Sequence, residues 1–270
     1  SIICVVLCCL DSVPVAQASC VKTENTRRLL TQQAHLRPFS EPIEDFSMRS
    51  LQANRRRWAT SNHTTFSLHH FFDKIMVIAI PKRMEYMKRF CKQMYIRPTY
   101  IKPVLKSNIG ANMLEEMAPY HNANTGRLAC HMSHLKALRE AFKDPSTRNV
   151  LVFEDDAKTN FSIGKMNHIL QDAMTHLPAD WDVLYLGKCW DCCERTAQIS
   201  THLDRVYCPK CRHAIAFSRK GAEKVLSVTL PMHDNGDEMI SALVSSGKLK
   251  AYGVEPMVFS QARAELGTNL

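Results

Sequence analysis

The chain has 270 residues, 45% of them hydrophobic, and a formal net charge of +9. This composition is that of a globular protein and excludes a chain too polar to bury a core. The basic residues form no dense run inside the folded part and match no nucleic-acid motif, so we expect no nucleic-acid partner. A mild positive field suits a nucleotide-diphosphate substrate or an anionic membrane surface.

The first residues, 1–18, carry the features of a secretory signal. Residues 1–10 are an uncharged apolar run, and Ala16-Gln17-Ala18 offers a small-residue cleavage site. The run is short for a membrane span, but a longer upstream sequence would make it a signal anchor, so membrane anchoring through the N-terminus stays open, as does a buried N-terminal strand. We expect the secretory pathway (endoplasmic reticulum or Golgi lumen) or secretion. The sequons at Asn62 and Asn160 are candidate N-glycosylation sites that agree with this route.

Residues 19–70 are polar and arginine-rich, with little periodicity. They predict a poorly ordered stem or linker, with a short helical subdomain around 47–58 as the alternative. The pattern changes at Phe71, so the folded domain is expected over residues 71–270.

Beyond the stem, apolar runs of strand length alternate with amphipathic segments. Expected strands are 75–80, one beginning at Val150, 181–186, 213–218 and 250–254. Expected helices are 82–94, 126–142, 163–177, 219–230 and 237–245. A cysteine-rich loop is expected over 188–210. The alternation predicts an α/β fold with a mostly parallel sheet covered by helices on both faces.

Three consecutive carboxylates, Glu154, Asp155 and Asp156, follow the apolar run that begins at Val150. A buried strand ending in this way delivers an acidic cluster to the edge of a sheet, where open α/β sheets bind ligands. Crowded carboxylates repel one another unless a cation lies among them. The segment therefore predicts a site for a hard divalent cation and, through it, a phosphate-bearing substrate; a polar turn that caps the next helix is the alternative.

Five of the eleven cysteines cluster in the cysteine-rich loop and directly after it. The spacings Cys-x-x-Cys at its two ends are those of a zinc ribbon, but an oxidising compartment favours disulfides. We expect disulfides, with structural zinc as the alternative and no readable connectivity. Because five is odd, one cysteine is free or pairs elsewhere, with Cys20, Cys91 or Cys130 as candidates. The disulfide candidates are Cys189, Cys192, Cys193, Cys208 and Cys211.

With these segments in order, the chain resembles glycosyltransferase family 25, which includes lipooligosaccharide and procollagen galactosyltransferases. The resemblance covers about residues 72–263. It rests on the blocks 73–83, 126–134, 150–156 with 181–187, and 214–222, and Asp237-Glu238, Pro256 and Gln261 also fit. The chain departs from the family pattern at Ala79, Tyr86 and Ala129.

The resemblance implies a GT-A-like fold and an inverting transferase that moves a sugar, usually galactose, from a UDP-sugar to a hydroxyl. Acceptors left open are a glycan, a lipid-linked sugar or a collagen-like protein. The cofactor expected from an oxygen-rich site is Mn²⁺ or Mg²⁺. The alternative functions are a catalytically inactive relative that acts as a secretory-pathway binding or scaffolding protein, and a zinc-ribbon protein of the cytosol or nucleus.

The candidate metal ligands are Glu154 and Asp156, since alternate residues of an extended segment face the same way. Asp155 then points into the neighbouring structure, or exchanges roles if the strand ends early. Asp237 or Glu238 is the candidate catalytic base on the acceptor hydroxyl; both also suit the positive end of a helix dipole. The nucleotide-sugar-binding candidates are Ile80, Pro81, Arg83, Ser133, His134 and Asp155, with core packing as the alternative role of His134.

Overall fold

The computed structural model describes residues 67–110 and 125–267, which belong to the unit Arg37–Leu270. The expected signal segment, most of the expected stem, Cys20 and the Asn62 sequon lie outside the described residues. Asn160 is described and exposed, two residues before Ser162, whose side chain caps the following helix.

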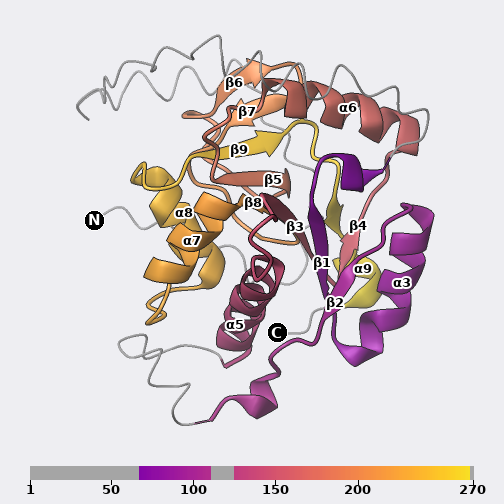
Figure 1. Cartoon of the computed structure of the whole chain (residues 1–270), viewed down its shortest axis with the longest axis vertical. Helices are drawn as coiled ribbons and strands as arrows, with labels where there is room; N and C mark the ends of the chain where they lie inside the picture. Colours follow the sequence, from indigo (N-terminus) through magenta and orange to yellow (C-terminus); the bar gives the residue numbers. More distant parts are fainter. Residues whose placement is uncertain (1–66, 111–124, 268–270) are drawn as a thin grey trace. The chain divides into compact units, whose positions relative to one another are not determined.

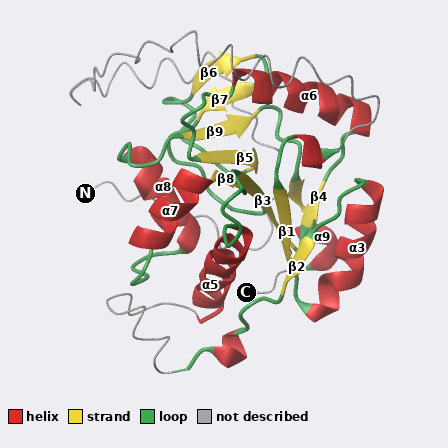
Figure 2. Cartoon of the chain, viewed as in Figure 1, coloured by secondary structure: helices red, strands yellow, loops and turns green. Residues whose placement is uncertain are grey.

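The core of the fold is an eight-stranded sheet with the strand order β2-β1-β3-β8-β5-β9-β7-β6 (Figures 1 and 2). β8 runs antiparallel to β3 and β5, and β7 runs antiparallel to β9 and β6, so the other six strands point the same way. This confirms the expected α/β fold with a mostly parallel sheet. The strands are β1 Lys74–Ile78, β2 Thr99–Ile101, β3 Asn149–Glu154, β5 Val183–Gly187, β6 Ala197–Ser200, β7 Leu203–Arg205, β8 Ala214–Ser218 and β9 Ala251–Val254.

Helices cover both faces of this sheet, as expected (Figure 1). One face packs against α3 Met84–Gln93 and α6 Ile163–His176, whose buried side chains include Phe90 and Leu170. The other face packs against α5 Thr125–Ala141, α7 Arg219–Val228 and α8 Gly236–Ser245. Burying both faces explains why the central strands read as continuous apolar runs rather than as alternating ones.

The remaining elements are short. They are the 3-10 turns η1 Leu68–His70, η2 Pro81–Arg83 and η3 Lys106–Asn108, the two-stranded ladder of β4 Ala157–Lys158 with β10 Ser260–Gln261, and α9 Arg263–Leu266. No helix within residues 67–110 and 125–267 is long and apolar enough to cross a bilayer.

Two sequence expectations about local structure are wrong. The cysteine-rich segment is not a loop throughout, because β6 and β7 within it form a hairpin that extends the sheet past β9. The strand β3 ends at Glu154, and Asp155 and Asp156 lie in a turn before β4. The alternation that was to align Glu154 with Asp156 therefore does not extend to Asp156.

Candidate active site

The candidate site lies at the edge of the sheet where β1 and β3 end and β8 begins. Ile78 is opposite Glu154 in the parallel pair, and Phe153 is opposite Ala214 in the antiparallel pair. This register brings the turn after β1, the three carboxylates and the segment before β8 together. The ladder of β4 and β10 brings Gln261 to the same edge, next to Asp156.

Glu154 faces α5. Its Oε1 accepts a hydrogen bond from His134 Nε2 at 2.8 Å and lies 3.7 Å from the Cys130 thiol. Burial raises the pKa of Glu154, but the hydrogen bond from His134 and the cationic groups around it outweigh burial and lower the pKa to about 2. Burial, followed by the charge of Arg212, lowers the pKa of His134. Glu154 is therefore a fixed carboxylate.

Arg212, which the sequence interpretation missed, is buried beside this pair. One Nη donates to His131 Nδ1 at 3.2 Å and the other lies 3.6 Å from Cys130 Sγ. His131 Nε2 donates to the Thr229 carbonyl at 3.2 Å, which leaves Nδ1 as the acceptor. Among the described residues no carboxylate lies within ion-pair distance of Arg212. Its only sequence signal was its place directly before the expected strand 213–218.

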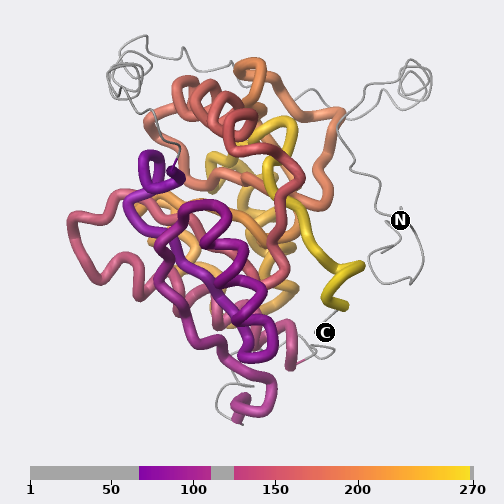
Figure 3. Tube along the Cα trace, turned by 90° about the vertical axis from the view of Figure 1, so that its right-hand side faces the viewer, coloured from indigo at the N-terminus to yellow at the C-terminus, as the bar shows by residue number. Residues whose placement is uncertain are grey.

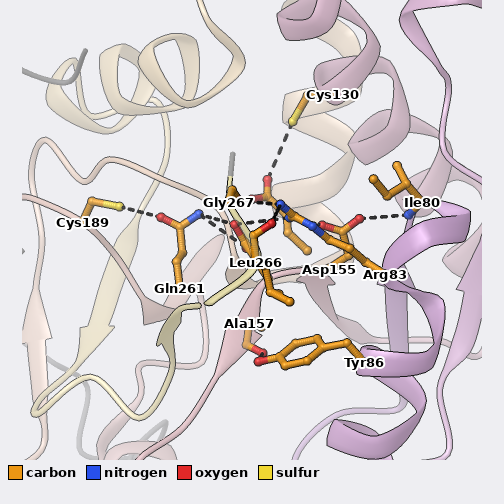
Figure 4. A network of polar contacts seen from close by, with 12 residues as sticks. Ile80, Arg83, Tyr86, Cys130, Asp155, Ala157, Cys189, Gln261, Leu266 and Gly267 are labelled. Carbon is orange, nitrogen blue, oxygen red and sulfur yellow. Dashed lines mark hydrogen bonds and ion pairs between the residues drawn. The ribbon is translucent and has the colours of Figure 1, made fainter. Parts of the chain in front are cut away.

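Asp155 is bound from the other side of the edge. Arg83 Nη1 donates to its Oδ1 at 2.8 Å, and the Ile80 backbone N–H donates to its Oδ2 at 2.9 Å (Figure 4). Arg83 also donates to the Gly267 carbonyl at 2.6 Å. The C-terminal segment, yellow in Figure 3, thus returns to the side that carries α3. The structure brings Ile80, Arg83 and Asp155 together as expected, but the Arg83 guanidinium is already engaged.

Asp156 is the least compensated carboxylate of the three. Gln261 Nε2 donates to its Oδ2 at 3.2 Å, while the nearest guanidinium nitrogen, on Arg83, is 3.9 Å away. Burial, then the charges of Glu154 and Asp155, raise the pKa of Asp156 to about 6. A raised carboxyl pKa of this kind marks negative charge that the protein itself does not neutralise.

The candidate base residues begin α8. The Asp237 carboxylate accepts a hydrogen bond from the Cys211 backbone N–H at 3.2 Å, and Glu238 forms an ion pair with Lys210. Burial raises the pKa of the Cys130 thiol to about 12, and the charges of Glu154 and Asp237 act in the same direction. The thiol on which these charges act lies 3.7 Å from Glu154 Oε1.

Two predicted donor-pocket residues have other neighbours. The Ser133 hydroxyl donates to the Ala129 carbonyl at 2.6 Å and accepts from the Val104 N–H at 2.8 Å, so it fixes the segment after β2 to α5. Pro81 is exposed and opens η2, which starts the turn toward α3. Neither is brought to the carboxylates by a recorded contact, whereas His134 is.

The expected disulfides are present: Cys189 pairs with Cys211 and Cys192 with Cys208. Cys193 is also disulfide-bonded, while Cys91 and Cys130, considered as its partners, carry free thiols. The structure thus favours disulfides over structural zinc in this segment.

The donor set at the sheet edge suits a divalent cation through its carboxylates. Glu154 is ionised, and the pKa of Asp156 is raised first by burial and then by repulsion from Glu154 and Asp155. Among the described residues, two tight groups of three ligand atoms occur, and neither includes Asp156: Cys130 with His134 and Glu154, and Cys189 with Cys211 and His213.

No family model matches this chain. It is 24% identical over 131 residues to procollagen galactosyltransferase 2 of Homo sapiens, a match that covers 43% of this chain and 21% of the relative. The match thus spans about a fifth of the length of that relative. A solved structure, mannose-1-phosphate geranyltransferase from Thermus thermophilus, overlaps with a TM-score of 0.32 at 13% identity, over 67% of this chain and 73% of that chain.

Proposed function

We propose that this chain is a metal-dependent, inverting glycosyltransferase that moves a sugar, galactose in the first instance, from a UDP-sugar to an acceptor hydroxyl. The observation that carries the proposal is Asp156, a buried carboxyl with a pKa of about 6 at the edge of the sheet beside two further carboxylates. The partial sequence match to a galactosyltransferase supports the same reaction class.

The leaving group of such a transfer is a diphosphate whose charge must be neutralised. We assign Glu154 and Asp156 as the ligands of Mn²⁺ or Mg²⁺, which supplies Lewis-acid stabilisation when bound. His134 keeps Glu154 oriented through its 2.8 Å hydrogen bond, and Gln261 restrains Asp156 from the opposite side. These contacts limit the movement of both carboxylates, as a preorganised site requires.

The acceptor hydroxyl needs a base on the side opposite the leaving group. Asp237 is the better candidate, because its neighbour Glu238 already pairs with Lys210 and an incoming hydroxyl would compete with that ammonium group. The single backbone hydrogen bond from Cys211 holds Asp237 while leaving acceptor capacity on its carboxylate. Asp237 would take the proton of the hydroxyl as its oxygen forms the new glycosidic bond.

The turn after β1 would bind the nucleotide. Arg83 is bound by Asp155 and by the carbonyl of Gly267, so its first role is to fix the turn that contains Ile80 and Pro81. We assign this turn to the nucleotide and the disulfide-bonded segment to the acceptor side. Disulfides of this density favour an oxidising compartment, in keeping with a lumenal or secreted enzyme.

The decisive experiment is a transfer and hydrolysis assay with a panel of UDP-sugars, in Mn²⁺ and in EDTA. We expect turnover of UDP-galactose that needs metal, with Asp237→Asn about 10³-fold slower and Glu238→Gln within about tenfold of the unsubstituted chain. Absence of turnover together with absence of calorimetric UDP and Mn²⁺ binding would instead support an inactive binding or scaffolding protein.

A further inference from the structure

Trp190 is held rigidly and yet exposes its side chain. It lies between Cys189, which is bonded to Cys211, and Asp191, which is buried and accepts the backbone N–H groups of Cys192 and Cys208 at 2.9 Å. The Trp190 side chain is nevertheless 50% exposed, and the other large hydrophobic residues exposed within the described ranges are Tyr95 and Val228. A large aromatic surface presented on a braced backbone is typical of a binding surface.

The backbone of Trp190 is paired with the segment that leads to Cys211. Trp190 and Lys210 form an antiparallel bridge, in which the Lys210 N–H donates to the Trp190 carbonyl at 3.0 Å. Directly opposed residues of an antiparallel pair project to the same side, with Cβ atoms about 5 Å apart. Trp190 is therefore the backbone neighbour of Lys210, whose ammonium pairs with Glu238 in the first turn of α8.

The segment that carries Trp190 is linked to Asp156 through Gln261 and to Asp237 through Cys211. The Cys189 sulfur lies 3.3 Å from Gln261 Oε1, and the amide nitrogen of the same Gln261 donates to Asp156. Cys211, the disulfide partner of Cys189, donates its N–H to Asp237. The Cys189–Cys211 disulfide thus connects the segment both to Gln261, which binds Asp156, and to Asp237.

A buried hydroxyl lies in the same region. Tyr185 on β5 is 1% exposed, and its hydroxyl has no hydrogen-bond partner among the described residues. Burial raises the pKa of this hydroxyl. Buried polar groups without partners are rare and call for an explanation such as a ligand.

We infer that Trp190 is the platform of the acceptor subsite and that the acceptor is a hexopyranoside, whose apolar C–H face packs on the indole while a hydroxyl reaches Asp237. The inference rests on the proposed function, which supplies the role of Asp237. The chemistry matches a sugar ring, because the exposed indole offers contact to C–H groups, and Asp237, held by the disulfide-linked Cys211, offers a hydrogen-bond acceptor to hydroxyls. An extended peptide acceptor would not need the aromatic face.

The test measures binding of methyl β-galactoside and methyl β-glucoside to the full chain, by saturation-transfer NMR without any nucleotide sugar. We expect Trp190→Ala to weaken binding about tenfold, and Trp190→Phe to retain most of it. Tyr95→Ala, which removes the other exposed aromatic residue, is the matched control and should bind as the unsubstituted chain does. Melting temperatures should agree among the variants, because Trp190 is half exposed.

Equal binding by Trp190→Ala and the unsubstituted chain would overturn the platform, as would failure of the unsubstituted chain to bind either glycoside. Transfer confined to hydroxylysine peptides, with an unchanged KM in Trp190→Ala, would also overturn it in favour of a peptide acceptor. Calorimetry with UDP-galactose keeps the two proposals apart: Trp190-dependent glycoside binding without nucleotide-sugar binding would contradict the transferase and leave the platform standing.

Discussion

The two sides of the carboxylate edge treat neighbouring aspartates in opposite ways. On the side of the β1 turn, Asp155 receives a guanidinium and a backbone N–H, and these ion-pair and hydrogen-bond contacts compensate its charge. On the β10 side, Asp156 receives one amide hydrogen bond and retains a raised pKa of about 6. The difference separates a carboxylate that holds the fold together from one that is available to a cation.

The largest expected effect is the loss of transferase activity when the charge of Asp156 is removed. Asp156→Asn should reduce transfer from UDP-galactose by about 10³-fold, because the metal loses a charged ligand. The folded state should survive, since the substitution also removes repulsion with Glu154 and Asp155. Steady-state kinetics with Mn²⁺ measures the first effect and urea unfolding the second; an active Asp156→Asn enzyme would refute the assignment.

On the side of the β1 turn, where Arg83 compensates Asp155, we expect a substitution to reduce stability. Arg83→Ala leaves Asp155 buried without its cation and should lower the free energy of unfolding by about 3–5 kcal/mol. Lys82→Ala, at the exposed neighbouring position, is the control and should change it by less than about 0.5 kcal/mol. Adding Asp155→Asn to Arg83→Ala should restore part of the loss, and a double variant no more stable than the single one would argue against the pair.

The Cys189–Cys211 disulfide, which links the Asp156 and Asp237 sides of the site, should contribute less to stability than the Arg83–Asp155 ion pair. Replacing both Cys189 and Cys211 by serine opens a bridge across a sequence separation of 22, for which we expect a loss of about 2–4 kcal/mol of unfolding free energy. Transfer should fall as well, because Gln261 and the Cys211 N–H lose a fixed position. The matched control is Cys91→Ser, a buried free thiol on α3; activity loss in that control alone would point to general destabilisation.

The smallest effect is the dependence of stability on pH. Folding raises the pKa of Asp156 from 3.8 to about 6, so its contribution is fully present below about pH 3.8 and is lost as pH rises through 6. Between pH 7 and pH 5 the unsubstituted chain should therefore gain roughly 1 kcal/mol relative to Asp156→Asn. Paired urea titrations at the two pH values measure this, and a difference of zero or of opposite sign would contradict the raised pKa.

Local sequence determined most of the sheet and helices. The apolar run from Val150 and the amphipathic segment 126–142 appear as β3 and α5 within one or two residues of the expected bounds. These elements are long or strongly patterned, so their own propensities and burial decide them. The hairpin of β6 and β7 escaped the pattern because its strands are short and largely polar, and pairing with β9 is what makes them strands.

In the candidate site, too, the local sequence determined some features and the tertiary contacts determined others. The sequence by itself placed Glu154, Asp155 and Asp156 at a strand end. A continuous apolar run indicates a strand buried on both faces, and three carboxylates can follow it only where the strand leaves the core. Which of the three is compensated depends on Arg83, His134, Arg212 and Gln261, which are 20 to 105 positions away along the chain. Only the tertiary structure brings such distant groups within hydrogen-bond range, and those contacts, rather than residue type, decide whether a carboxylate supports the fold or remains free for a ligand.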